Sequence, residues 1–140
     1  MIKEIADYYG VELVEVQAGD KYCKANGEDS YIDRSFVAGR YIEIGIYADP
    51  EKKLVSFFHE MGHILTPKRV HNKCRTKYQV EEKAWKYGYK LAKSFGIEFN
   101  KDTKQWAKEQ LNGYKGYEER KIYSKIGAIS FYRSYPDERI

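Results

Sequence analysis

The chain has 140 residues, a length that suggests one domain over 1–140, and 42% of them are hydrophobic, which is enough for a packed core. Its formal net charge of +4 permits anionic partners without requiring one. No apolar run reaches membrane-spanning length and no signal-peptide core is present, so we expect a soluble, cytoplasmic protein with no membrane partner. Cys23 and Cys74 are too few for a secreted disulfide scaffold and are expected as reduced thiols, with zinc ligation by Cys74 or a disulfide as alternatives.

The first third of the chain predicts one short helix and then strands. The expected elements are a helix at 2–9 and strands at 11–17, 21–25, 31–37 and 40–48. Turn-forming residues separate these segments. In the last strand, Ile42, Ile44 and Ile46 share one face, which predicts that this face packs on the core.

The next stretch predicts a helix whose two ends are both marked. Asp49 can cap the N-terminus, Pro50 suits the first helical position, and Thr66-Pro67 ends the helix. An apolar stripe recurs at helical spacing: Leu54, Phe58, Met61 and Leu65. A polar set falls on another face: Ser56, His59, Glu60 and His63. We therefore expect a helix that is buried on one side and carries these polar residues on another.

His59-Glu60-Met61-Gly62-His63 is a complete H-E-x-x-H motif. Histidines at i and i+4 lie one turn apart on the same side of a helix, so both imidazoles can reach one metal ion, and Zn²⁺ is the metal that this pairing most often holds. Glu60 stands beside the ligands, where it can act as general base without binding the metal. The alternative is a surface helix that carries two histidines by chance.

A second long helix is predicted at 78–95, with Gly96 after its end. Glu81 falls on the packed face, which is costly for a carboxylate unless something pairs with it. Its neighbour Glu82 has a solvent role with Lys86 at i,i+4. We therefore predict Glu81 as the third zinc ligand, with His71 as the alternative.

The spacing also excludes another zinc pattern. The sequence H-E-x-x-H-x-x-G-x-x-H would need a glycine and a histidine where Thr66 and Arg69 stand. His59, His63 and Glu81 instead give a His₂Glu set with an open position for water.

The segment 68–77 is predicted as a loop rich in positive charge: Lys68, Arg69, Lys73, Arg75 and Lys77. A solvated surface loop is the simplest interpretation. The alternative is a rim that attracts an acidic substrate segment or nucleic acid, and nucleic-acid binding rests on this loop alone.

Beyond the second helix, Asp102 or Thr103 can cap a third helix that runs to Asn112, with Trp106, Gln110 and Leu111 on its inner side. Residues 113–140 are expected as a C-terminal extension, in which 117–126 are compatible with a helix and 128–132 with a strand.

The run from Arg40 to Leu65 resembles the strand, turn and H-E-x-x-H segment of ImmA/IrrE-type zinc peptidases, and the second helix matches theirs at Glu81 and Ala84. The resemblance covers roughly residues 1–95. Trp85 departs from it, because the family commonly has asparagine there. The resemblance implies an α+β, compact zincin-like fold, in which a small twisted sheet packs on the H-E-x-x-H helix and on a second helix that carries the third ligand. It also implies zinc-dependent hydrolysis of a protein or peptide substrate, often a regulatory protein.

In the expected mechanism, Zn²⁺ held by His59, His63 and Glu81 acidifies a water molecule, and Glu60 passes its proton to the leaving amine. His71 or Tyr78 could donate to the oxyanion, although a surface or packing role is the favoured interpretation of both residues. The alternative function is a binding or regulatory module that keeps this fold and acts by docking.

Overall fold

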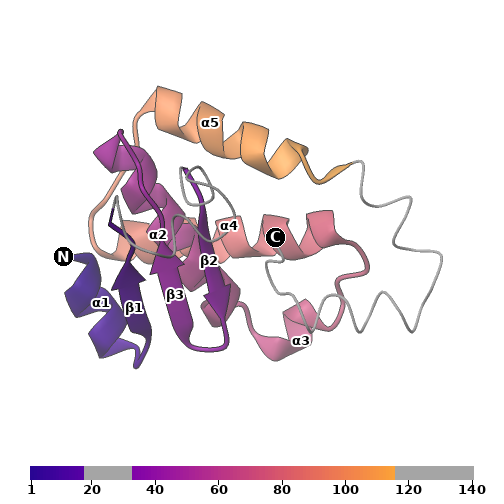
Figure 1. Cartoon of the computed structure of the whole chain (residues 1–140). Helices are drawn as coiled ribbons and strands as arrows, with labels where there is room; N and C mark the ends of the chain where they lie inside the picture. The colour runs from indigo at the N-terminus through magenta and orange to yellow at the C-terminus, as the bar shows by residue number, and fades with distance from the viewer. Residues whose placement is uncertain (18–32, 116–140) are drawn as a thin grey trace.

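The computed structural model describes residues 1–17 and 33–115, and it confirms the α+β class (Figure 1). The described elements are α1 (Ile2–Tyr8), β1 (Glu12–Glu15), β2 (Ser35–Ala38), β3 (Tyr41–Ile44), α2 (Pro50–Leu65), α3 (Lys68–His71), α4 (Lys77–Ser94) and α5 (Lys101–Asn112). The strand expected at 21–25 and the segments expected within 117–132 lie outside the described residues. No helix in the described ranges is long and apolar enough to cross a membrane.

The described strands form one sheet in the order β1-β3-β2, with β3 parallel to β1 and antiparallel to β2. Strands β2 and β3 form a hairpin that turns at Gly39, whose φ of 61° suits glycine. Both strands are shorter than predicted. Asp33 has a left-handed φ of 54° and is not extended, and β2 begins at Ser35, which pairs with Ile44.

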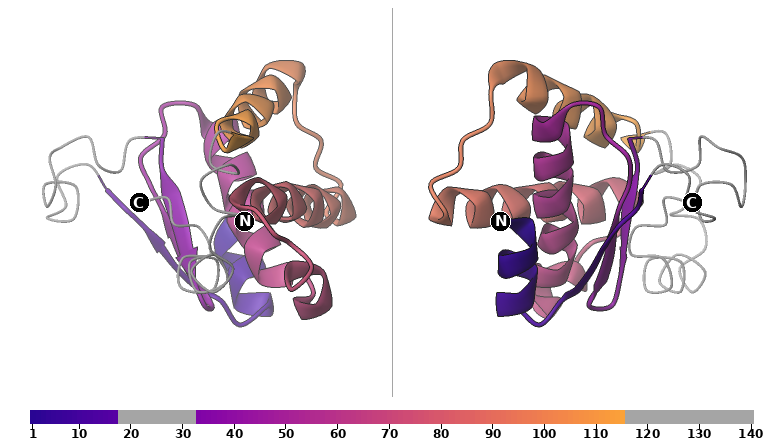
Figure 2. Two further views of the ribbon diagram at one scale, coloured as in Figure 1. Left: turned by 90° about the vertical axis from the view of Figure 1, so that its right-hand side faces the viewer. Right: turned by 60° about the vertical axis from the view of Figure 1, so that its left-hand side comes forward.

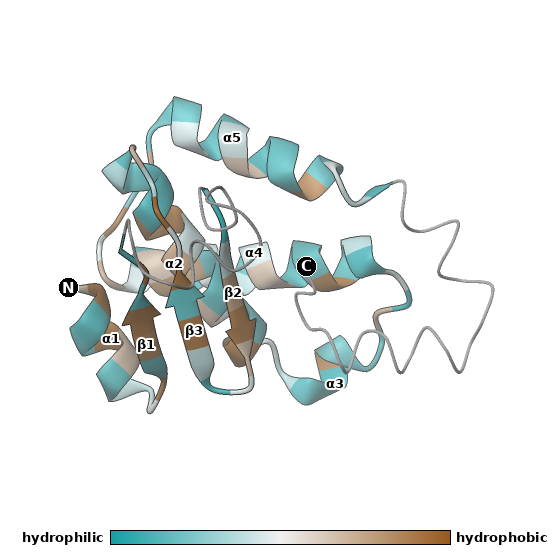
Figure 3. Cartoon of the chain, viewed as in Figure 1, coloured by the Kyte–Doolittle hydropathy of each residue, from teal (hydrophilic) through white to brown (hydrophobic). Residues whose placement is uncertain are grey.

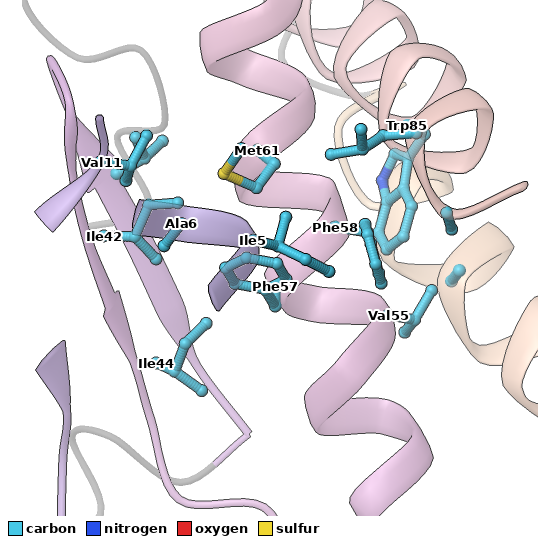
Figure 4. Packing of buried hydrophobic residues seen from close by; sticks show 14 of the residues in the cluster. Ile5, Ala6, Val11, Ile42, Ile44, Val55, Phe57, Phe58, Met61 and Trp85 are labelled. Atoms are coloured by element: carbon cyan, nitrogen blue, oxygen red, sulfur yellow. The ribbon is translucent and has the colours of Figure 1, made fainter. Parts of the chain in front are cut away.

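The described helices lie on one side of the sheet, and α2 packs directly against it while α4 crosses behind α2 (Figure 2). Ile42 and Ile44 are completely buried on the face toward α2, which confirms the predicted core face at these two residues, whereas Ile46 lies beyond β3 and is only partly buried. Figure 4 shows that Phe57 and Met61 point to the sheet while Phe58 points to Trp85 of α4. Hydrophobic residues gather on the strands, whereas α5 is mostly hydrophilic (Figure 3). The core is therefore a layer between the sheet and α4 that is centred on α2.

The prediction that α2 is buried on one side only is wrong. Every residue from Val55 to Gly62 is buried, so the middle of α2 is an interior helix. The apolar stripe indicates the face toward the core correctly at Phe58 and Met61, but Leu54 and Leu65 at its ends are only partly buried. Helix α4 covers the polar face, which therefore lies inside the protein.

Helices α2 and α4 touch through their backbones at two glycines. A Cβ atom on Gly62 would lie 1.8 Å from the carbonyl oxygen of Ala84, and one on Gly88 would lie 2.3 Å from the carbonyl oxygen of Phe58. Real atoms cannot approach so closely, so both positions need glycine. Gly62 is the fourth residue of the H-E-x-x-H motif, so the motif lies at the closest contact between the two helices.

Side-chain caps set the helix boundaries. Asp49 caps α2 by accepting from the amide of Glu51 at 2.9 Å, as predicted, and Thr76 caps α4 by accepting from the amide of Gln79. The predicted cap of α5 is wrong, because Asn100 rather than Asp102 or Thr103 accepts the capping hydrogen bond, which comes from the amide of Thr103 at 2.8 Å.

Two further expectations are corrected. The basic segment 68–77 contains the short helix α3, so it is not a loop throughout. The predicted inner side of α5 is confirmed at Trp106 and Leu111, which are partly buried against the core, but Gln110 is exposed. Thr103 and Ala107, which were not predicted on this side, are the buried residues of α5. The hydroxyl of Thr103 donates to Glu51, and this bond ties the start of α5 to the start of α2.

The glycine contact predicts that Gly62→Ala destabilises the protein by about 3 kcal/mol or more, because the added methyl overlaps the α4 backbone. Alanine is the better helix former by about 1 kcal/mol, which offsets only part of this cost. Urea unfolding followed by circular dichroism measures the change. Gly113→Ala is the control with a far smaller expected effect, because the nearest atom there is 3.3 Å away. If Gly62→Ala is as stable as the wild type, the close packing of α2 on α4 is incorrect.

Candidate metal centre

Three side chains from two helices converge in the interior behind the sheet. His59 and His63 extend from successive turns of α2, and Glu81 extends from the second turn of α4. The Nε2 atom of His59 lies 2.9 Å from Oε1 of Glu81, and Nε2 of His63 lies 3.2 Å from Oε2 of the same carboxylate. The three residues predicted as ligands are therefore brought together.

The arrangement fits a small divalent metal ion. Four ligands at about 2.1 Å from Zn²⁺ are separated by about 3.4 Å along the edges of a tetrahedron. The two separations between imidazole nitrogen and carboxylate oxygen are a few tenths of an ångström shorter than this edge, so a small outward movement of the carboxylate would accommodate the ion. The ligand atoms of His59, Glu60 and His63 also lie within 4.8 Å of one another, close enough to hold a metal ion.

The cluster is buried, which excludes a surface helix that carries two histidines by chance. The side chains of His59, His63 and Glu81 are 11%, 5% and 2% exposed. Burial by itself raises the pKa of Glu81, but the imidazoles of His63 and His59 outweigh burial and hold that pKa well below its ordinary value. The carboxylate is therefore ionised and available as a metal ligand.

Trp85 orients the first histidine. Its ring stacks on the imidazole of His59, with ring centroids 4.0 Å apart and an interplanar angle of 26°. Stacking fixes the plane of the ring, so Nε2 points to Glu81. The Nδ1 atom of His59 is buried and accepts or donates no hydrogen bond within the described ranges. Here the indole takes the orienting role that a hydrogen-bond acceptor has at many metal sites.

A cavity of about 290 Å³ opens beside the cluster. Its lining comes from β2, α2, α4 and α5 and from the segments next to them: Asp33, Arg34, Ser35, Tyr47, Ser56, His59, Glu60, Glu81, Trp85, Trp106, Gln110, Gly113 and Tyr114. Glu60 is only 4% exposed and faces this cavity next to His59. The cavity can thus admit a small group or a side chain next to His59, Glu60 and Glu81.

Three other candidates lie away from this centre. His71 ends α3 and Tyr78 lies in the first turn of α4, and neither lines the cavity. Their role as oxyanion donors stays a prediction. Cys74 is a free thiol whose Sγ lies 3.5 Å from the carbonyl oxygen of Val70, and burial raises its pKa. Cys23 lies outside the described residues.

Several side chains at the site were not singled out by their sequence pattern. Tyr47 lines the cavity, and its hydroxyl is 2.9 Å from Oγ of Ser35. In the predicted strand at 40–48, Tyr47 falls on the face opposite Ile42, Ile44 and Ile46. Strand alternation could have indicated this face, but it does not show that Tyr47 lies near the H-E-x-x-H motif. Tyr114 lines the cavity from the segment after α5. Lys77 was placed in the basic loop, but it is buried beside Glu81.

Tyr47 provides a prediction for alkaline pH. Burial raises its pKa to about 12, whereas a tyrosine in an unfolded chain titrates near 10. Below pH 10 both states are protonated. Above it the unfolded state loses its proton first, so stability falls between pH 10 and 12. The free energy of unfolding should drop by about 1.4 kcal/mol at pH 11 through this group. Tyr47→Phe removes this contribution, so urea titrations of the two proteins from pH 9 to 11 should diverge, and parallel curves would contradict the assignment.

Comparisons with known proteins identify no relative. No protein-family model matches the chain, no curated protein matches it, and no solved structure matches it. A function can therefore be inferred only from the side chains of this centre and their geometry.

Proposed function

We propose that the protein is a zinc-dependent peptidase with a zincin-like fold, similar to ImmA/IrrE-type peptidases. The observation that carries the proposal is the meeting of Nε2 of His59 and Nε2 of His63 at the Glu81 carboxylate, with Glu60 on the adjoining cavity. Two imidazoles and one carboxylate are a donor set that catalytic zinc sites use. His59, His63 and Glu81 would hold the ion.

When bound, the zinc ion would supply a Lewis acid and an acidified water molecule. Glu60 acts as the general base that accepts a proton from water and delivers it to the leaving amine. Its carboxylate suits this role because it lines the cavity together with His59 and Glu81. Trp85 keeps the imidazole of His59 in place beside the cavity.

A peptide is the substrate class that fits the surroundings best. Asp33, Arg34 and Ser35 line the cavity at the start of β2, which is an outer strand of the described sheet. An extended peptide can pair with an outer strand and so bring its backbone to an adjoining site. The cavity of about 290 Å³ would take one or two side chains, which favours a narrow choice of protein substrate.

Metal analysis tests the ligand set. We expect one zinc ion per chain after gel filtration, measured by inductively coupled plasma mass spectrometry. His63→Ala should lose most of this zinc, because two ligands hold the ion far less tightly than three. His71→Ala is the matched control, since it removes a histidine that lies outside the cluster, and it should keep its zinc. Zinc lost from His71→Ala but kept by His63→Ala would show that the ligand set is wrong.

Glu60→Gln separates hydrolysis from docking. The substitution keeps the shape of the side chain but removes the base, so we expect peptide cleavage to fall by a factor of at least about 100 with zinc content unchanged. Cell lysate can be incubated with either protein and new amino termini mapped by mass spectrometry. Cleavages should appear with the wild type only. The same cleavages with both proteins, or biological activity that survives in Glu60→Gln, would rule out this mechanism.

A further inference from the structure

Lys77 is the one lysine that is buried among residues 1–17 and 33–115. Its side chain is 1% exposed in the first turn of α4. The ammonium Nζ lies 3.6 Å from Oε2 of Glu81, four residues further along the helix, and 5.5 Å from the ring centroid of Tyr114. A buried ammonium is costly unless an anion balances it, and here the balancing anion is the carboxylate proposed as a metal ligand.

The ammonium and the proposed metal ion therefore share one carboxylate. Oε2 of Glu81 is 3.2 Å from Nε2 of His63 and 3.6 Å from Nζ of Lys77. Lys77 does not line the cavity, although Glu81 and Tyr114 both do. It is therefore placed to act on the centre through Glu81 and not by touching a substrate in the cavity.

We propose that Lys77 is a built-in counter-ion of Glu81 that competes with the metal and so lowers the affinity of the centre for divalent ions. This inference rests on the proposed function. When no metal ion is bound, the ammonium of Lys77 offsets the charge of the Glu81 carboxylate. A divalent ion that binds Glu81 introduces a like charge close to the ammonium, in an interior where screening is weak. The pair stabilises the fold whenever no ion is bound and makes the metal easier to release.

Lys77→Met tests the competition, because it keeps an unbranched side chain that is one atom shorter and removes the charge. Zn²⁺ affinity is measured against a chromophoric chelator. We expect Lys77→Met to bind Zn²⁺ about tenfold more tightly than the wild type or better. The matched control is Lys90→Met, which removes an exposed charge from the same helix and should change the affinity by less than about twofold.

An equal or weaker Zn²⁺ affinity in Lys77→Met would overturn the proposal. Equal affinity would mean that Lys77 has no effect on metal binding, and weaker affinity would mean that Lys77 positions Glu81 as a ligand. Wild-type protein that binds no Zn²⁺ would overturn the metal centre itself. The two failures are therefore distinguishable.

A double-mutant cycle on protein treated with a chelator tests the ion pair without any metal. Lys77→Met and Glu81→Gln should each lower the melting temperature by several degrees, because each removes the ion pair between the buried ammonium and the buried carboxylate. The double variant should be more stable than the sum of the two losses predicts. Additive losses would overturn the pairing. If Lys77→Met alone does not fold, folding of the double variant supports the same coupling, and its failure to fold overturns it.

Discussion

The centre of this protein depends on one buried carboxylate. Glu81 is 1% exposed, and two imidazoles and one ammonium from three other positions surround it. An isolated anion at this depth would be strongly destabilising, so the fold requires cations or polar hydrogens to face it. The same requirement makes the site suitable for a metal ion, because a divalent cation satisfies a buried carboxylate and two imidazoles together.

The second constraint is the close approach of α2 and α4. Gly62 and Gly88 allow the two backbones to touch, and this contact brings the turn that carries His59 and His63 within reach of a short glutamate side chain. A larger residue at either position would separate the helices and move the carboxylate away from the imidazoles. The glycine in the motif thus has a structural task that is distinct from the chemistry of its neighbours.

Aromatic packing completes the site. Trp85 stacks on His59, and its ring centroid lies 5.8 Å from that of Tyr89. The imidazole is therefore packed against a pair of aromatic rings from α4. Here a stacked indole fixes the plane of the imidazole by shape, whereas a hydrogen-bond acceptor would fix it by direction.

The sequence by itself determined the local features: the α+β class, the capped helix α2, the isoleucine face of β3 and the three residues that meet at the centre. These follow from short-range rules, because caps, i,i+4 spacing and strand alternation act within a few residues. Only the tertiary structure decided that α2 is an interior helix, that Asn100 begins α5, that Tyr47 borders the cavity and that Lys77 is buried beside Glu81. Each of these depends on which element packs against which, and periodicity along one segment carries no information about its partner.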